Sequence, residues 1–216
     1  MHLQNREQCG FKQKKFLEIR MNIDNHWRKF LKDGDEGSFS IIYDHYVDKL
    51  FSYGIHLGFN EESCKDAIQD VFCKLYVAHK KLSHVENLTA YLFKSLRYRL
   101  IDFTRRDFRT DDLEQVSETF SIDVTILDNI IDEETTFLLK AKVENLLNSL
   151  SSQQREAVYM RYMLELEYSE IGDLLEIKPE SVRKLVYRAI EKLREQIGEN
   201  DSKALQTLCI LLITNL

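Results

Sequence analysis

The sequence predicts an all-α fold: two small helical domains joined by an acidic linker, the C-terminal one a helix-turn-helix. Turn-forming residues are scarce, with 7 Gly and 1 Pro among 216 residues, which argues against a β-rich fold. Hydrophobic residues make up 44% of the chain, enough to bury a core. We expect helical units at 21–109 and 137–198, the linker at 110–136, a disordered lead at 1–20 and an apolar tail at 199–216.

Three apolar stripes at helical spacing predict the helices of the first unit. Their members are Phe39, Ile42, Tyr43, Tyr46 and Leu50; then Ala67, Ile68, Val71, Phe72, Leu75 and Tyr76; then Leu88, Tyr91, Leu92, Leu96, Leu100 and Phe103. Asn60 and residues 83–87 are expected breaks between these helices. Among the aromatic and apolar positions we assign Leu75, Tyr76, Tyr91, Leu92 and Phe103 to the core.

The second unit carries recognisable helix starts. Ser151 with Gln154 three residues later predicts a capping box that opens a helix. A short helix through Ile171 and Leu174 follows, and Pro179 suits the first position of the last helix, where its missing N–H costs nothing. That last helix carries one apolar face, made of Val182, Leu185, Val186, Ala189, Ile190 and Leu193.

Charge is segregated along the chain although the net charge is -6. Residues 94–109 hold six basic and two acidic side chains, and residues 178–194 hold six and two again, so each segment is +4. Between them, residues 110–136 hold nine acidic side chains and no Lys or Arg. Phosphate neutralisation needs clustered cations, so two basic helices separated by an acidic connector indicate nucleic-acid binding.

The segment 168–189 predicts a short helix, a tight turn and a longer helix, which is a helix-turn-helix. Its outward side would carry Glu180, Ser181, Arg183, Lys184, Tyr187 and Arg188. Such a helix can enter a major groove, where Arg and Lys reach guanine edges or phosphates. An ordinary helical hairpin with a wet, basic face is the alternative interpretation of this motif.

Three segments, in order, resemble bacterial sigma factors of the extracytoplasmic-function group. Residues 148–194, starting Asn-Ser-Leu-Ser-Ser-Gln-Gln-Arg, resemble their C-terminal domain, and residues 66–76 (Asp-Ala-Ile-Gln-Asp-Val-Phe-Cys-Lys-Leu-Tyr) resemble their polymerase-binding helix. Residues 90–106 (Ala-Tyr-Leu-Phe-Lys-Ser-Leu-Arg-Tyr-Arg-Leu-Ile-Asp-Phe-Thr-Arg-Arg) resemble the helix that opens and reads the promoter. The resemblance extends over about residues 36–108 and 138–196.

The resemblance implies a sigma factor that binds core RNA polymerase and directs promoter recognition, strand opening and transcription initiation. Residues implied to grip the clamp helices of the largest polymerase subunit are Asp66, Gln69, Asp70, Phe72 and Lys74. Residues implied to contact the minus-ten element are Arg97, Tyr98, Arg99, Arg105 and Arg106. Residues implied to contact the minus-thirty-five element are Ser181, Arg183, Lys184, Tyr187 and Arg188. Cations that alternate with aromatic rings can hold a backbone while unpaired bases stack on the rings.

Three positions depart from the family pattern. Tyr98 stands where Asn is usual, and Glu167 stands where Ser usually caps a helix. Glu176 stands where the turn often carries Gly, so a left-handed backbone there would be strained.

The implied partners are core RNA polymerase, including its flap, promoter DNA and an anti-sigma factor, often membrane-bound. We expect no catalytic site, no cofactor, no metal and no small-molecule substrate. The cysteines (Cys9, Cys64, Cys73 and Cys209) lack metal-ligand spacing, which favours reduced thiols in a cytoplasmic protein. No apolar run reaches the roughly 18 residues of a membrane span, and residues 1–20 lack the apolar core of a secretory signal.

Four other readings of the chain remain open. The acidic linker is plain solvated chain, or it competes with DNA through Asp111, Asp112, Glu114 and Glu118. The apolar tail packs on the C-terminal domain, or it docks an inhibitory partner. A third alternative is that the protein is an autonomous helix-turn-helix regulator that acts without polymerase. A fourth is that it is a carboxylate-metal nuclease that uses Asp66, Asp70 and Asp102.

Overall fold

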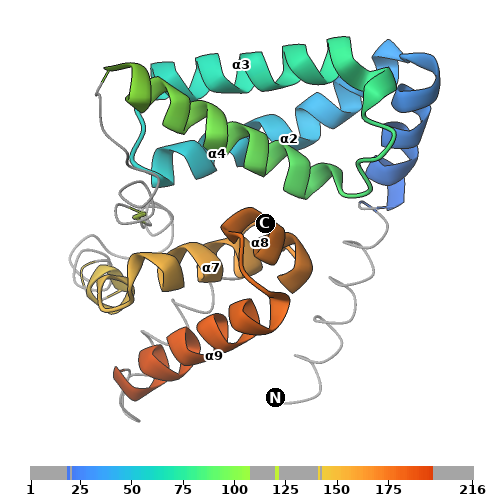
Figure 1. Ribbon diagram of the computed structural model, residues 1–216. Coiled ribbons are helices and arrows are strands. Elements are labelled where there is room, and N and C mark those ends of the chain that lie inside the picture. The colour runs from blue at the N-terminus through green and yellow to red at the C-terminus, as the bar shows by residue number, and fades with distance from the viewer. Residues whose placement is uncertain (1–18, 20, 108–119, 122–140, 142, 197–216) are drawn as a thin grey trace, which may run out of the picture.

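The computed structural model describes residues 19, 21–107, 120–121, 141 and 143–196, and among them it contains helices and no strand (Figure 1). The elements are α2 (Glu36–His56), α3 (Glu61–Ala78), the 3-10 turn η1 (His79–Lys81), α4 (Leu88–Asp107), α7 (Ser152–Tyr162), α8 (Tyr168–Leu175) and α9 (Pro179–Gln196). Residues 21–33 and 143–148 are also helical. The all-α fold class predicted from the sequence is confirmed.

The helix starts follow local chemistry. Asp35 caps α2, where its carboxylate accepts the backbone N–H of Ser38 at 2.8 Å, and Asn60 caps α3 in the same way. The hydrogen bonds from Ser38 and Lys29 lower the pKa of Asp35 to about 2. At α7 the predicted capping box of Ser151 and Gln154 is present in both directions. Pairing these otherwise unsatisfied backbone donors is what fixes where each helix begins.

The helices α2, α3 and α4 form one layer around a common core (Figure 1). Gly54 of α2 lies where a Cβ atom would come within 2.6 Å of the Sγ atom of Cys64, so the helices cross closely there. The core assignment holds for Leu75 and Leu92, which are fully buried. It is wrong for Tyr76, which is 40% exposed because it lies at the edge of the α2–α3 contact. Tyr91 and Phe103 are partly buried against the core.

The helix-turn-helix is formed by α8 and α9 as predicted, with Pro179 as the first residue of α9. Glu176 ends α8 in the left-handed region at φ 58°, a conformation that is strained for glutamate. Gly172 is required here for a different reason: a Cβ atom would come within 2.7 Å of the carbonyl oxygen of Ile177. The turn therefore approaches α8 too closely for any side chain at this position.

The two layers lie against each other (Figure 1), and one large cluster of buried residues spans both, beside a smaller second cluster within the C-terminal layer. Helix α8 packs against α4, and buried residues of α7, α8 and α9 belong to the same cluster as those of α2, α3 and α4. Phe120, from the predicted linker, is fully buried between the layers, with its ring centroid 6.2 Å from that of Tyr53 and 5.4 Å from that of Tyr159. This part of the linker is therefore fixed by packing.

Candidate functional site

The outward face of α9 is open to solvent. Val182, Val186 and Ala189 are buried on one side of the helix, at helical spacing. The predicted minus-thirty-five residues on the other side are all exposed: Ser181, Arg183, Lys184, Tyr187 and Arg188. An α-helix with one face anchored in the core and the other carrying free donors has the geometry for a DNA groove.

Internal pairing on this face is weak. The guanidinium of Arg183 lies 3.6 Å from the carboxylate of Glu180, and both side chains are largely exposed. Exposed pairs of this kind stabilise a protein little and exchange readily for phosphate. A hydrogen bond to the carboxylate of Glu191 raises the pKa of the Tyr187 phenol. The cations of α9 therefore remain accessible in this conformation.

The minus-ten candidates on α4, unlike the exposed residues of α9, are engaged with other parts of the chain. Arg97 pairs with the fully buried Glu156 of α7, and its side chain is only 13% exposed. Arg97 also donates to the hydroxyl of Tyr53 at 3.0 Å, and that hydroxyl donates to Glu156 at 2.8 Å. Burial and the Glu156 carboxylate raise the pKa of Tyr53 well above its usual value, which keeps this hydroxyl a donor.

Next to Arg97, two further α4 candidates contact other elements. Tyr98 is 43% exposed and donates its hydroxyl hydrogen to Glu176 in the helix-turn-helix turn. Arg99 pairs with Asp70 of α3 and stacks over the ring of Phe103, 4.5 Å from its centroid. Arg105 and Arg106 lie in the last turns of α4, beyond the last side chain of this helix that the structure describes.

The polymerase-binding candidates lie along α3. Asp66, Gln69 and Lys74 are exposed, Asp70 is partly buried and Phe72 is buried. Gln69 and Phe72 line a groove of about 750 Å³ between α2 and α3, whereas the other three candidates lie outside it. The structure therefore divides the predicted set into a groove lining and an outer surface.

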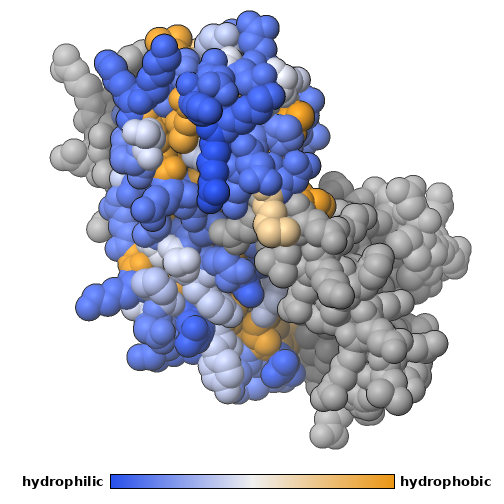
Figure 2. Space-filling model, turned by 90° about the vertical axis from the view of Figure 1, so that its right-hand side faces the viewer, coloured by the Kyte–Doolittle hydropathy of each residue, from blue (hydrophilic) through white to orange (hydrophobic). Residues whose placement is uncertain are grey.

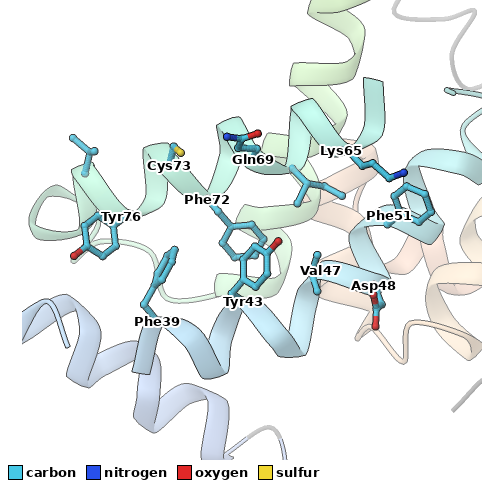
Figure 3. Close-up of a pocket in the computed structure, with 12 residues that line it drawn as sticks. Phe39, Tyr43, Val47, Asp48, Phe51, Lys65, Gln69, Phe72, Cys73 and Tyr76 are labelled. Carbon is cyan, nitrogen blue, oxygen red and sulfur yellow. The ribbon is translucent and has the colours of Figure 1, made fainter. Parts of the chain in front are cut away.

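The groove is mainly aromatic (Figure 3). Phe39 and Tyr43 of α2 point toward Phe72 of α3, with ring centroids 6.0 Å and 4.7 Å from that of Phe72. Tyr76 completes the cluster at 5.1 Å from Phe39. Sequence reasoning assigned the α2 side to a core stripe only. The sequence did contain a signal for this groove. Phe39 and Tyr43 widen the apolar stripe of this helix beyond the arc centred on Ile42 that faces the core.

Among the described residues, no group of three His, Cys, Asp or Glu side chains is placed to hold a metal ion. Asp70, one of the three carboxylates of the nuclease alternative, is paired with Arg99, so it is engaged in an ion pair. The described thiols, Cys64 and Cys73, are free, and burial raises the pKa of Cys64 to about 11. The linker carboxylates Asp111, Asp112, Glu114 and Glu118 and the tail at 199–216 lie outside the described residues.

No helix in the described part of the chain is long and apolar enough to cross a membrane. In Figure 2 the described residues on the face turned to the viewer are mostly hydrophilic, with apolar side chains in small patches.

Two protein-family models match the chain. The model described as Sigma-70 region 2 matches residues 42–110, and the model described as Sigma-70, region 4 matches residues 140–193. Together they span more than half of the sequence. The first contains α3 and α4, and the second contains α7, α8 and most of α9.

Characterised relatives and solved structures agree with these matches. The chain is 25% identical to the ECF RNA polymerase sigma factor SigW of Bacillus subtilis (strain 168) over 179 residues, which is 79% of this chain and 95% of SigW. It is 20% identical to SigM of the same organism over 154 residues, 71% of this chain and 91% of SigM.

Two solved structures share the fold. CnrH, solved in complex with the cytosolic domain of CnrY, superposes with a TM-score of 0.53 at 18% identity, covering 82% of this chain and 99% of CnrH. RpoE from Bartonella quintana, solved with the anti-sigma factor NepR, superposes with a TM-score of 0.52 at 20% identity, covering 75% and 98%.

Proposed function

The chain belongs to the sigma-70 family of RNA polymerase sigma factors, in the extracytoplasmic-function group, and we propose that three of its surfaces bring promoter specificity to core polymerase. The alternative of a helix-turn-helix regulator acting without polymerase is not favoured, because such a regulator has no need of a sigma region 2. We propose a cytoplasmic initiation factor with no catalytic site of its own.

The outward face of α9 reads the minus-thirty-five element as duplex. This proposal is carried by the exposure of all five predicted contact residues on a helix whose opposite face is buried. Arg183, Lys184 and Arg188 supply charge-assisted donors for base edges and phosphates, and Ser181 supplies a hydroxyl.

The basic and aromatic residues of α4 bind the minus-ten element as the strands separate. Arg97 and Arg99 would hold phosphates, while the ring of Tyr98 would stack on an unpaired base. Arg105 and Arg106 extend the same basic segment toward the end of the helix. This role requires Arg97 and Arg99 to exchange their present carboxylate partners for phosphates.

The α2–α3 surface docks on polymerase. Asp66, Gln69, Asp70 and Lys74 supply polar contacts for a basic helical hairpin, and the aromatic groove with Phe72 at its base supplies apolar area. CnrH and RpoE were solved with CnrY and with the anti-sigma factor NepR, and we propose an anti-sigma partner for this chain by analogy.

Run-off transcription with purified core polymerase tests the function. We expect specific transcripts from genomic templates only when this chain is added, and none from any template would overturn the assignment. In the same assay, Asp66→Ala with Gln69→Ala should lower the affinity for core without loss of helix content, since both side chains are exposed. Glu62→Ala, an exposed change at the start of α3, is the matched control.

A further inference from the structure

The α2–α3 groove is an open, mainly apolar surface in the described part of the chain. Along its walls Tyr43 is 37% exposed, Tyr76 is 40% exposed and Val77 is 84% exposed. The charged side chains in its lining are Asp48 and Lys65, and the ammonium of Lys65 is already in an ion pair within α3. Apolar patches that remain open on a folded chain mark sites that another segment or a partner covers. This groove fits an uncharged, apolar occupant.

The long stretches of the chain outside the described residues differ in charge. The lead at 1–18 carries six charged side chains, and residues 110–136 carry nine acidic ones. Residues 204–216, within the apolar tail, carry no Asp, Glu, Lys or Arg. The tail therefore has the composition that the groove requires, whereas the lead and the linker would bring charges against its aromatic lining.

The tail also has an amphipathic pattern. Four leucines follow the spacing i, i+3, i+7 and i+11, which places them on one face of a helix: Leu205, Leu208, Leu212 and Leu216. Thr207 and Thr214 fall on the opposite side of the same helix. Amphipathic helices of this kind bind apolar grooves by inserting such a row of side chains.

The lengths of the segment and the groove agree. A helix of residues 205–216 would be about 18 Å long, at about 1.5 Å per residue. The lining of the groove runs from Phe39 to Phe51 on α2 and from Lys65 to Val77 on α3, which is about 20 Å of each helix. A docked helix could therefore cover the aromatic rings in Figure 3 from one end of the groove to the other.

The connection to α9 favours this docking. Residues 197–204 lie between α9 and the leucine face, and when extended they span up to about 28 Å, at about 3.5 Å per residue. A compact chain of 216 residues has a radius of gyration of about 17 Å, so the segment is not confined to the C-terminal unit. A tethered segment acts at an effective concentration on the order of millimolar. A modest affinity is therefore enough to fill the groove.

We propose that residues 205–216 form an amphipathic helix that docks in the α2–α3 groove and competes there with core polymerase. The competition rests on the proposed function of the groove, whereas the docking does not. Asp66 and Lys74 are exposed and lie outside the groove, so polymerase can meet this outer surface while the tail is docked. Displacement of the tail is then a step in the assembly of the chain with polymerase.

The leucine variant, Leu208→Glu with Leu212→Glu, tests the docking because it puts two carboxylates on the apolar face of the tail. The threonine variant, Thr207→Glu with Thr214→Glu, is the matched control, since it adds the same charge on the opposite face. Both variants should keep the cooperative thermal melt of the unchanged chain, which is the criterion for folding.

Photo-crosslinking locates the tail. Benzoylphenylalanine in place of Tyr43 puts the reactive group beside the ring of Phe72 in the groove. Trypsin releases residues 204–216 as one peptide, because Lys203 precedes them and they contain no Lys or Arg. We expect cross-links to this peptide within one molecule in the unchanged chain and the threonine variant, and their loss in the leucine variant. Cross-links to another segment or to a second copy in place of the tail overturn the docking, as does the absence of any tail cross-link.

The affinity for core polymerase reports the competition. By biolayer interferometry on immobilised core, we expect the leucine variant to bind about tenfold more tightly than the unchanged chain, corresponding to a groove open in about one-tenth of the molecules. The threonine variant should bind like the unchanged chain. Equal affinity in the leucine variant overturns the competition. Failed run-off by the unchanged chain overturns the proposed function, on which the cross-linking does not depend.

Discussion

The basic segments 94–109 and 178–194, which contribute most of the cations of α4 and α9, carry equal excesses of positive charge but meet different surroundings in the structure. The five candidate contacts on α9 are exposed, and the ion pair there is loose. On α4, Arg97 and Arg99 are mostly buried and paired. Charge content therefore predicts that a helix can bind nucleic acid, but not whether it is free to do so.

The difference follows from position in the fold. Helix α9 packs along one side only, against α7 and α8. Helix α4 lies between α3 and the C-terminal unit, so carboxylates reach it from both sides: Asp70 from α3, and Glu156 and Glu176 from α7 and α8. Internal anions take the places that phosphates would take.

The largest expected effect is at Glu156. Glu156→Ala leaves the guanidinium of Arg97 buried without a counter-charge, which should cost about 3–5 kcal/mol in the free energy of unfolding. Glu180→Ala, which removes the partner of Arg183 on the open helix, should change it little. Urea unfolding monitored by circular dichroism measures both, and equal losses would contradict the contrast between the two helices.

The helix-turn-helix itself depends on Gly172. Gly172→Ala places a methyl group against the backbone carbonyl of Ile177, which cannot yield as a side chain can, so we expect a loss of about 1–3 kcal/mol. Gly37→Ala in α2 is the control, because its Cβ atom meets only ordinary contacts and alanine favours a helix. Thermal melting compares the two variants. If Gly172→Ala melted at the same temperature as the unchanged chain, the close contact would be ruled out.

Because the outward face of α9 is exposed, we predict that the free chain binds duplex DNA without any rearrangement of its two units. Arg188→Ala should weaken binding of the free chain to minus-thirty-five duplex by about 1–3 kcal/mol and leave unfolding unchanged. Tyr98→Phe, which removes only the hydroxyl bonded to Glu176, should leave this duplex affinity unchanged. Fluorescence anisotropy over a salt series measures both, and a weaker Tyr98→Phe complex would mean that α4 also contacts the duplex.

The smallest effect concerns His45, near the interface between the units. Burial, with Lys49, lowers its pKa from 6.5 to about 4. The unfolded chain therefore takes up this proton first, so stability is lost as the pH falls from 6.5 toward 4. His45→Gln should make the melting temperature depend less on pH in that window. The loss of stability due to Asp35 should persist between pH 3.8 and about 2. An unchanged slope would place His45 in solvent.

Local sequence signals predicted much of the fold. The helix break at Asn60, the capping box at Ser151 and the position of Pro179 each depend on a few adjacent residues, and each is present. The exposed face of α9 followed from helical spacing alone, since its apolar positions leave only one side for the charged ones.

Contacts between distant segments were not predictable in this way. Glu156 lies in a polar stretch, Gln-Gln-Arg-Glu, that suggests a solvated face, yet it is fully buried. Phe120 lies among acidic residues and yet fills the space between the layers. Tyr76 continues an apolar stripe but borders a groove. No local pattern marks these residues, because their partners are far away along the chain.

The amino-acid order by itself determined the helices, their ends, the helix-turn-helix and the two basic segments, because these depend on neighbours within one or two turns. Only the tertiary structure decided which basic segment is free, since that depends on which carboxylates the packing of α7 and α8 brings against α4. Spacing along a helix fixes which side a residue occupies, while the partner it meets there is set by how the helices pack.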